Sequence, residues 1–228
     1  NKIKVKVDFL YAMGTFPENG LIEPVPGKLY GTAIGGGQFS GGTLFEYDII
    51  TEEFVVKASF SNSVTGANPF GKLLKAANGQ LYGMTYSGGS EDLGAIFQYN
   101  LTTEVLTKKI DFDGTIKGSN PRSGFIEVNG HLYGLTSKGG DNDEGVLFEY
   151  TTSTNAFVKK IDFSNELTGK SPFGGLTIGT DTELFGTTFE GGTVNKGVIF
   201  KFDYSDDSFT RVIDFDGEMK GESPIGPM

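Results

Sequence analysis

Short apolar runs alternate with glycine-rich polar segments along the whole chain, and the pattern recurs at a fixed interval. The Leu-Tyr-Gly segment around Tyr30 returns around Tyr82 and Tyr133 and, as Leu-Phe-Gly, around Phe185, at intervals of 52, 51 and 52 residues. The apolar runs are short and rich in β-branched and aromatic residues, which is typical of strands. No segment has the i, i+3, i+4, i+7 spacing of an amphipathic helix, so no helix is predicted.

Each repeat contains four predicted strands. The first follows a proline, as at Pro69, Pro121 and Pro172, and the second is the Leu-Tyr-Gly segment. The third strand ends at an aromatic residue in every copy: Tyr47, Tyr99, Tyr150 and Phe202. The fourth ends at a phenylalanine that occurs five times: Phe9, Phe60, Phe112, Phe163 and Phe215. A repeat of about 50 residues with four strands has the size of a propeller blade. We therefore predict an all-β fold, a β-propeller or an arc of one, with four complete four-stranded blades and a partial blade at each end.

Glycine and asparagine occupy the positions where the predicted strands must turn. Asn78–Gly79 and Asn129–Gly130 separate the first and second strands, and such pairs favour tight hairpins. A glycine pair and a later single glycine enclose the loop between the second and third strands in each copy. Because each sheet buries both faces, the repeated Tyr and Phe side chains are predicted to stack between neighbouring blades.

The strand count leaves both ends of the repeat array incomplete. We predict one domain over residues 1–228, with units at 10–60, 61–112, 113–163 and 164–215. An orphan fourth strand at residues 2–9 precedes them, and a partial unit at 216–228 follows. Such a chain is part of a longer one, an arc completed by another copy, or a four-bladed ring with spare ends. Because an unpaired strand edge is sticky, residues beyond Met228 or a second copy are expected to cover the orphan strand.

The repeat motif also resembles a known family. The pattern Gly-x-Leu-Tyr-Gly-x-Thr-x-x-Gly-Gly, followed by Gly-x-[Val/Ile/Leu]-Phe, is similar to the GloVer (Gloeo/Verruco) tandem repeat over residues 17–228. The segment from Thr65 to Pro69 resembles that family's Asp-Gly-Ala-Asn-Pro linker, whereas Thr182 and Phe185 depart from its Gly and Tyr. The resemblance implies a β-propeller-like bacterial protein that is secreted or displayed at the cell surface. It implies no activity, so it assigns no catalytic residue.

Charge and composition narrow the classes of partner. The formal net charge is −10, which argues against nucleic acid and anionic membrane surfaces, since both need a basic patch. The chain has no cysteine, so its compartment is not indicated by disulfides, and it shows no transmembrane run. A glycan, a protein at the surface, the rest of a longer chain or another copy are the expected partners.

The loops between the second and third strands differ most between repeats, so they are the predicted ligand-binding positions. The candidate residues are Phe39, Glu91, Asp92, Leu93, Asp141, Asp143, Glu144, Val194 and Asn195. Phe39 and Leu93 are expected to be exposed anchors. Asp141, Asp143 and Glu144 supply hard oxygen ligands that suit calcium, which is the one cofactor that the sequence suggests. A solvated acidic turn is the alternative explanation for these residues.

Catalytic residues are not apparent. His131, the single histidine, occupies a position where other repeats have Lys28, Gln80 and Glu183, which indicates an exposed turn. The Asp-Phe-Asp-Gly segments at Asp111 and Asp214 recur between blades, so their carboxylates are predicted to accept turn hydrogen bonds. The residues expected to line the central channel are small: Asn19, Gly71, Ser123, Gly174 and Gly226. No cluster of metal-binding side chains is visible there.

The sequence therefore favours an extracellular, non-enzymatic binding or scaffold propeller that holds a glycan or protein through loops on one face. The alternatives are a carbohydrate-active hydrolase or lyase with carboxylates near the channel, and a purely architectural repeat spacer.

Overall fold

The computed structural model describes residues 6–180 and 182–225, which form four sheets of four antiparallel strands. Blade 1 contains β1 (Ile22–Val25), β2 (Lys28–Ala33), β3 (Thr43–Asp48) and β4 (Phe54–Ser59). Blade 2 contains β5 (Ala67–Lys75), β6 (Leu81–Ser87), β7 (Ala95–Asn100) and β8 (Val105–Asp111). Blade 3 contains β9 (Ile126–Val128), β10 (His131–Thr136), β11 (Val146–Thr151) and β12 (Ala156–Asp162). Blade 4 contains β13 (Thr177–Ile178), β14 (Glu183–Thr188), β15 (Val198–Asp203) and β16 (Ser208–Asp214).

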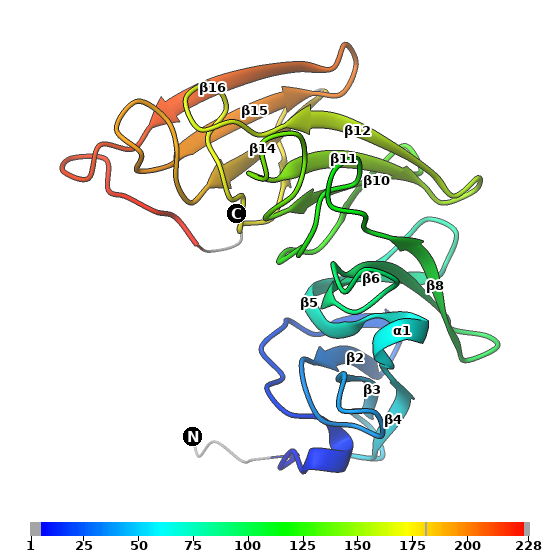
Figure 1. Ribbon diagram of the computed structural model, residues 1–228. Helices are drawn as coiled ribbons and strands as arrows, with labels where there is room; N and C mark the ends of the chain where they lie inside the picture. Colours follow the sequence, from blue (N-terminus) through cyan, green and yellow to red (C-terminus); the bar gives the residue numbers. More distant parts are fainter. Residues whose placement is uncertain (1–5, 181, 226–228) are drawn as a thin grey trace.

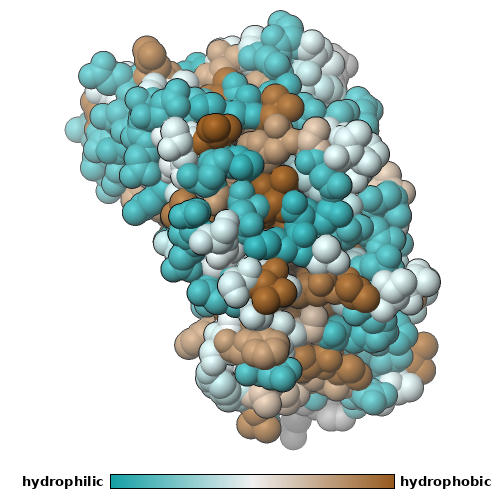
Figure 2. All heavy atoms as spheres, turned by 45° about the vertical axis from the view of Figure 1, so that its right-hand side comes forward, coloured by the Kyte–Doolittle hydropathy of each residue, from teal (hydrophilic) through white to brown (hydrophobic). Residues whose placement is uncertain are grey.

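The four blades follow one another along an arc, in chain order (Figure 1). Within each blade the strands pair in sequence order, and each sheet lies inside one predicted repeat unit. The predicted all-β, propeller-type fold is confirmed. The side of the molecule seen in Figure 2 is largely hydrophilic, with hydrophobic side chains in separate groups.

The ends of the predicted strands differ from the structure in three places. The first strands β1, β9 and β13 begin five residues after the repeated proline, whereas β5 includes Pro69. The first strand lies at the edge of each sheet, where proline is tolerated, so Pro69 can stand inside β5. Residues 6–9 of the predicted orphan strand and 223–225 of the predicted last strand form no strand. The remaining parts of those two predictions, at residues 2–5 and at 226, lie outside the described residues.

Two single-turn helices were not predicted. They are η1 (Tyr11–Met13) and α1 (Asn62–Thr65). In α1 the Ser61 amide donates to Thr65 Oγ1 at 2.8 Å, and the Thr65 amide donates to the Ser61 carbonyl at 2.9 Å. A local serine–threonine turn of this kind needs no amphipathic pattern, so apolar spacing does not reveal it.

The glycine of the Leu-Tyr-Gly motif has a packing role. Gly83 pairs with Phe97 across β6 and β7, and a Cβ atom on Gly83 would lie 2.4 Å from the Phe97 ring. The other blades repeat this arrangement, so the third-strand phenylalanine rests on the bare backbone of the second strand. The two halves of the repeat motif are therefore one contact.

Aromatic residues fill the spaces between neighbouring blades, as predicted. Phe60 at the end of blade 1 lies edge-on to Phe97 of blade 2, with ring centroids 4.9 Å apart. Tyr30 of blade 1 lies 6.3 Å from Tyr99 of blade 2, and equivalent pairs join the next blades. We call the blade face turned toward the preceding blade its leading face, and the opposite one its trailing face.

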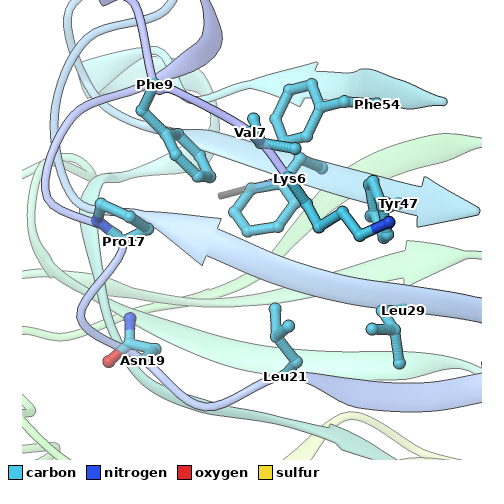
Figure 3. A pocket seen from close by; sticks show the side chains of 10 residues that line it. Lys6, Val7, Phe9, Pro17, Asn19, Leu21, Leu29, Tyr47 and Phe54 are labelled. Carbon is cyan, nitrogen blue, oxygen red and sulfur yellow. The ribbon is translucent and has the colours of Figure 1, made fainter. Parts of the chain in front are cut away.

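The leading face of blade 1 has no blade in front of it within the described residues. A hollow of about 370 Å³ lies there, lined mainly by apolar side chains (Figure 3). Leu21, Leu29 and Tyr47 line it, and Phe9 packs edge-on against Phe45 and Phe54 at 5.2 and 5.3 Å. Phe9 thus contacts blade 1 as the equivalent Phe60 contacts blade 2.

Candidate functional site at the channel mouth

The repeated Asn-Pro step brings side chains of neighbouring blades together. Asn120 has a φ of 53°, a left-handed conformation that Asn tolerates better than most residues. Its amide donates to the Leu93 carbonyl at 2.9 Å, and its side-chain Nδ2 donates to the Tyr86 carbonyl at 3.0 Å. Both acceptors belong to blade 2. The residue that follows Pro121 is therefore held beside Tyr86.

That residue is Arg122, and it lies among aromatic rings from the blades on both sides. Its guanidinium carbon is 5.0 Å from the Tyr86 ring centroid and 4.9 Å from that of Phe173. Phe70 lies 6.0 Å away, and Phe189 stacks on Phe173 with centroids 5.0 Å apart. We call Phe70, Tyr86, Arg122, Phe173 and Phe189 the Arg122 cluster. Cation–π attraction favours this position of the guanidinium between blades 2 and 4.

A pocket of about 340 Å³ adjoins this cluster, and we call it the channel pocket. Its lining residues come from the segments after the repeated prolines: Glu18, Asn19, Gly20, Gly71, Lys72, Arg122, Ser123, Gly124, Phe173, Gly175 and Ile225. Asn19, Gly71 and Ser123, which were predicted to line the central channel, line this pocket together. Gly174 is buried beside the pocket without lining it, and Gly226 lies outside the described residues.

The walls of the channel pocket are rigid because the first segments of adjacent blades touch through their backbones. Gly71 has a φ of 81°, and a Cβ atom there would lie 2.2 Å from the Ser123 carbonyl carbon. Asn19 Nδ2 donates to the Pro69 carbonyl at 3.1 Å, and Asn19 Oδ1 accepts from the Gly71 amide at 3.0 Å. Blades 1, 2 and 3 are thus joined at the channel.

Apart from Asn19, the polar side chains in the channel pocket have few partners. Ser123 is 6% exposed, yet its buried hydroxyl has no hydrogen-bond partner among the described residues. Glu18, Lys72 and Arg122 make no ion pair within the described part of the chain. A buried hydroxyl without a partner is costly, so it marks a place where water or a ligand belongs.

The predicted loop residues lie on separate blades and do not form one site. Phe39 is exposed, as expected of an anchor, and so are Glu91 and Val194. Leu93 is instead partly buried and packs on the core between blades 2 and 3, because it fills the space beside Gly114. The expectation that Leu93 is an exposed anchor is wrong.

Three of the predicted loop residues hold the loop itself in shape. Asp92, Asp143 and Asn195 occupy the same repeat position, and their φ angles are 59°, 56° and 57°. Each side-chain Oδ1 accepts from the first glycine of its glycine pair, at 2.7, 2.9 and 2.9 Å. Their recurrence is therefore explained by a turn that Asp and Asn favour.

Of the three proposed calcium ligands, Asp141 and Asp143 contact other partners through their carboxylates. Asp141 is exposed and contacts Lys159 Nζ at 3.2 Å, while Asp143 binds the Gly139 amide. Glu144 is half-buried, and its carbonyl accepts from the Ser171 amide at 2.8 Å. No group of three His, Cys, Asp or Glu side chains in the described ranges is arranged to hold a metal ion. A calcium site in this loop stays a prediction.

The repeated Asp-Phe-Asp-Gly carboxylates are engaged in turns. Asp111 Oδ1 accepts from the Ser90 amide at 3.1 Å, and Asp214 does the same for Thr193. These acceptors hold the loop of their own blade, whereas the crossing to the next blade is held by the second aspartate. Asp113 Oδ1 accepts from the Ile116 and Lys117 amides. Burial opposes ionisation of Asp113, but the bond from the Lys117 ammonium and the two amide bonds outweigh it and lower the pKa of Asp113.

His131 is not an isolated turn residue. It begins β10, and its Nδ1 lies 2.8 Å from Glu149 Oε1 and 3.0 Å from Thr151 Oγ1. Glu149 also accepts from Tyr133 and contacts Lys160, which reaches Asp207 of blade 4 at 2.8 Å. The sequence pattern did not predict this partner set, because Glu149 and Thr151 are brought opposite His131 only by strand pairing.

Blade 1 has the same charged chain. Lys28 Nζ donates to Glu46 at 2.6 Å, Tyr30 also donates to Glu46, and Lys57 links Glu46 to Glu104 of blade 2. Burial opposes ionisation of Glu46, but the hydrogen bonds from Lys28 and Tyr30 outweigh it and lower the pKa of Glu46. Burial, together with the Glu46 charge, raises the pKa of Tyr30. These charged contacts join blade 1 to blade 2.

A family model described as the Gloeobacter/Verrucomicrobia repeat matches residues 17–228. The chain belongs to this repeat family. The match confirms the resemblance noted in the motif, over the same residues. No curated protein shows significant similarity to the sequence.

Solved structures share the fold of this family member at low sequence identity. The extracellular domain of a protein assigned as a one-component system from B. thetaiotaomicron aligns with a TM-score of 0.68 and 12% identity. The alignment covers 98% of this chain and 26% of that one, so the repeat array spans about a quarter of its length. A structure of a nidogen/laminin complex aligns with a TM-score of 0.58 and 14% identity, and the alignment covers 90% of this chain and 65% of that one. A protein assigned as TolB from Agrobacterium tumefaciens aligns with a TM-score of 0.54 and 10% identity. That alignment covers 88% of this chain and 65% of the other.

The Arg122 cluster was missed by the sequence analysis, although its signal is present. The residue after the repeated proline is of four different types in five units: Glu18, Phe70, Arg122, Phe173 and Ile225. Variation at a position whose backbone is fixed by the repeat indicates that the side chain serves something other than the fold.

Proposed function

We propose that this repeat protein is a non-enzymatic binding or scaffold module that works outside the cell, as part of a secreted or surface-displayed bacterial protein. Its partner is a glycan or another protein. The observation that carries the proposal is the channel pocket, where charged side chains without ion pairs and the partnerless Ser123 hydroxyl lie beside the Arg122 cluster. Concave sites with a few fixed polar groups are typical of ligand binding.

Binding is favoured over catalysis by the distribution of carboxylates. Glycoside hydrolysis generally uses two carboxylates about 5 to 10 Å apart. Of the described residues that line the channel pocket, Glu18 is the one carboxylate. Asp111, Asp113 and Asp214, which recur between blades, are committed to turns.

The similar structures support a location outside the cell. One is an extracellular domain, and another is a complex of nidogen with laminin. Among the described residues, no helix is both long and apolar enough to cross a membrane. The exposed loop residues Phe39, Glu91 and Val194 are proposed as additional contacts for a large partner.

Affinity electrophoresis through gels containing neutral or acidic polysaccharides tests this function, combined with an assay for new reducing ends and for unsaturated sugar products. We expect retention by at least one polysaccharide without release of products. Product release that grows with protein concentration would contradict the non-enzymatic assignment. A pure spacer would not be retained by any polysaccharide, nor by immobilised surface proteins in a parallel binding assay.

A further inference from the structure

Arg122 is held in a way that leaves its hydrogen-bonding edge available. Tyr86 and Phe173 lie about 5 Å from the guanidinium carbon, and they come from blades 2 and 4. Arg122 Nη2 donates one weak hydrogen bond, to Tyr86 Oη at 3.5 Å. No carboxylate of the described residues pairs with Arg122. Stacking fixes the plane of a guanidinium and leaves its N–H groups for a planar acceptor such as a carboxylate.

The surroundings of Arg122 favour an anion that also carries hydroxyl groups. Lys72 and Arg122 outnumber Glu18 among the charged residues of the channel pocket, whereas the whole chain has a net charge of −10. Ser123, adjacent to Arg122 in the chain, lines the same pocket, and its hydroxyl is buried without a partner among the described residues. The pocket is therefore locally positive and has an unsatisfied hydroxyl beside the cation.

The size and lining of the pocket favour a sugar ring. Its volume of about 340 Å³ is at the small end of the range for small-molecule sites. Phe173 lines it and gives the pocket one aromatic wall. An acidic peptide side chain would satisfy the charge, but it would bring neither a ring face nor neighbouring hydroxyl groups for Ser123.

We infer that the channel pocket binds the uronate unit of an acidic carbohydrate chain. In this arrangement the uronate carboxylate accepts from the Arg122 guanidinium, a ring hydroxyl pairs with Ser123, and Lys72 adds positive charge at the rim. This inference deepens the proposed binding function and rests on it.

Calorimetric titration with a galacturonate tetrasaccharide, a neutral galactose tetrasaccharide and a tetraglutamate peptide tests the inference. We expect the acidic sugar to bind at least about tenfold more tightly than either of the others, as one charge-assisted bidentate contact implies. Binding should weaken as salt is added. The chain has two arginines, Arg122 and Arg211, so labelled Nε–Hε signals report directly on contact. The Arg122 signal should shift on titration, and that of Arg211 should not.

Matched variants separate recognition from folding. Arg122→Ala should weaken binding of the acidic sugar at least about tenfold, and Arg122→Lys should weaken it several-fold because it keeps the charge and loses the fork. Ser123→Ala should weaken it by a smaller factor. Arg211→Ala is the control, since Arg211 lies on β16 and pairs with Asp214. If Arg122→Ala fails to fold, the affinity of Arg122→Lys and the Arg122 signal of the unaltered protein still test whether Arg122 contacts the sugar.

Equal affinity for the neutral and the acidic sugar would overturn the uronate assignment. It would also be overturned if Arg122→Lys and Ser123→Ala kept the full affinity and the Arg122 signal did not move. Either result would leave the binding function standing. Preference for tetraglutamate would overturn it in favour of a protein partner. Absence of binding to all three probes would also overturn it. The proposed function itself fails only if the polysaccharide and surface-protein panels show no retention.

Discussion

The leading faces of blades 1 and 2 carry the same residue types in different surroundings. In blade 2, Leu81 and Tyr99 are completely buried against blade 1. Their equivalents in blade 1, Leu29 and Tyr47, are partly exposed and line the apolar hollow (Figure 3). Burial of a repeat position is therefore decided by the neighbouring blade rather than by the residue. The repeat unit is stable through its interfaces, as expected of an array whose members contact only their neighbours.

The trailing faces show the same contrast at the other end. Tyr82 of blade 2 is 1% exposed against blade 3, whereas its equivalent in blade 4, Phe185, is only half-buried. Phe215 at the end of blade 4 is likewise half-buried, although Phe60, Phe112 and Phe163 are completely buried. The two ends of the arc thus present the two halves of one kind of interface.

The largest expected effect comes from placing a charge on a covered leading face. Leu81→Lys should destabilise the protein by at least about 4 kcal/mol, because the ammonium would be buried without a partner. Leu29→Lys should change the free energy of unfolding by less than about 1 kcal/mol, since Leu29 lies at the open hollow. Urea unfolding followed by circular dichroism measures both. Equal losses would mean that something covers the leading face of blade 1 in solution.

A cavity tests the trailing faces in the same way. Tyr82→Ala should cost about 3 to 5 kcal/mol, because a large buried side chain leaves a void and Asn78 Nδ2 loses its hydroxyl partner at 3.0 Å. Phe185→Ala should cost less than half as much, since part of its surface is already in water. Thermal and urea unfolding would decide. A neutral Tyr82→Ala would show that the interface between blades 2 and 3 does not form.

The fold was predictable because its determinants lie in the repeat itself. The Leu-Tyr-Gly glycine, the third-strand phenylalanine and the glycine pairs each serve a local contact that recurs in every blade. The hairpins show the limit: both Asn129 and Gly130 have positive φ, whereas at Asn78–Gly79 only Gly79 does, in a longer turn. Residues 61–65 form a turn through Ser61 and Thr65, which apolar spacing cannot detect.

The candidate site was harder to predict than the fold, because it is made of contacts between blades. Arg122 and Phe173 are 51 residues apart in sequence, and only the packing of blades 3 and 4 brings them within 4.9 Å. The loop residues were predicted from their variation between repeats. Asp92 and Asp143, however, do the same thing in their own blades, because each accepts a hydrogen bond that stabilises its turn. Variation identifies a site when the side chain has no partner in its own repeat.

A smaller effect should separate the charged chain of blade 1 from the apolar interface around it. Glu46→Gln should cost about 1 to 2 kcal/mol at neutral pH, because Lys28, Tyr30 and Lys57 lose a charged partner. Since folding lowers the pKa of Glu46, its stabilising contribution is complete above the usual carboxyl pKa and is lost as pH falls through the lowered value. The difference between variant and parent should therefore shrink in acid. Glu91→Gln, at an exposed loop carboxylate, is the control and should change the free energy of unfolding at neutral pH by less than about 0.5 kcal/mol.

The smallest effect is expected at His131, where two readings of one position compete. An exposed turn residue would give no change on replacement by alanine, whereas the structure places Nδ1 at 2.8 Å from Glu149 and 3.0 Å from Thr151. Glu149 keeps Tyr133 and Lys160 in either case, and the His131 side chain is 38% exposed, so His131→Ala should cost about 0.5 kcal/mol and no more than about 1. His131→Lys should be neutral, because Lys28 occupies this position in blade 1 and pairs with the equivalent Glu46. Urea unfolding of the two variants, with and without Glu149→Gln, measures the coupling. A loss above about 2 kcal/mol for His131→Ala that His131→Lys does not rescue would show that the ring is needed for more than its partner, and would return His131 to the functional candidates.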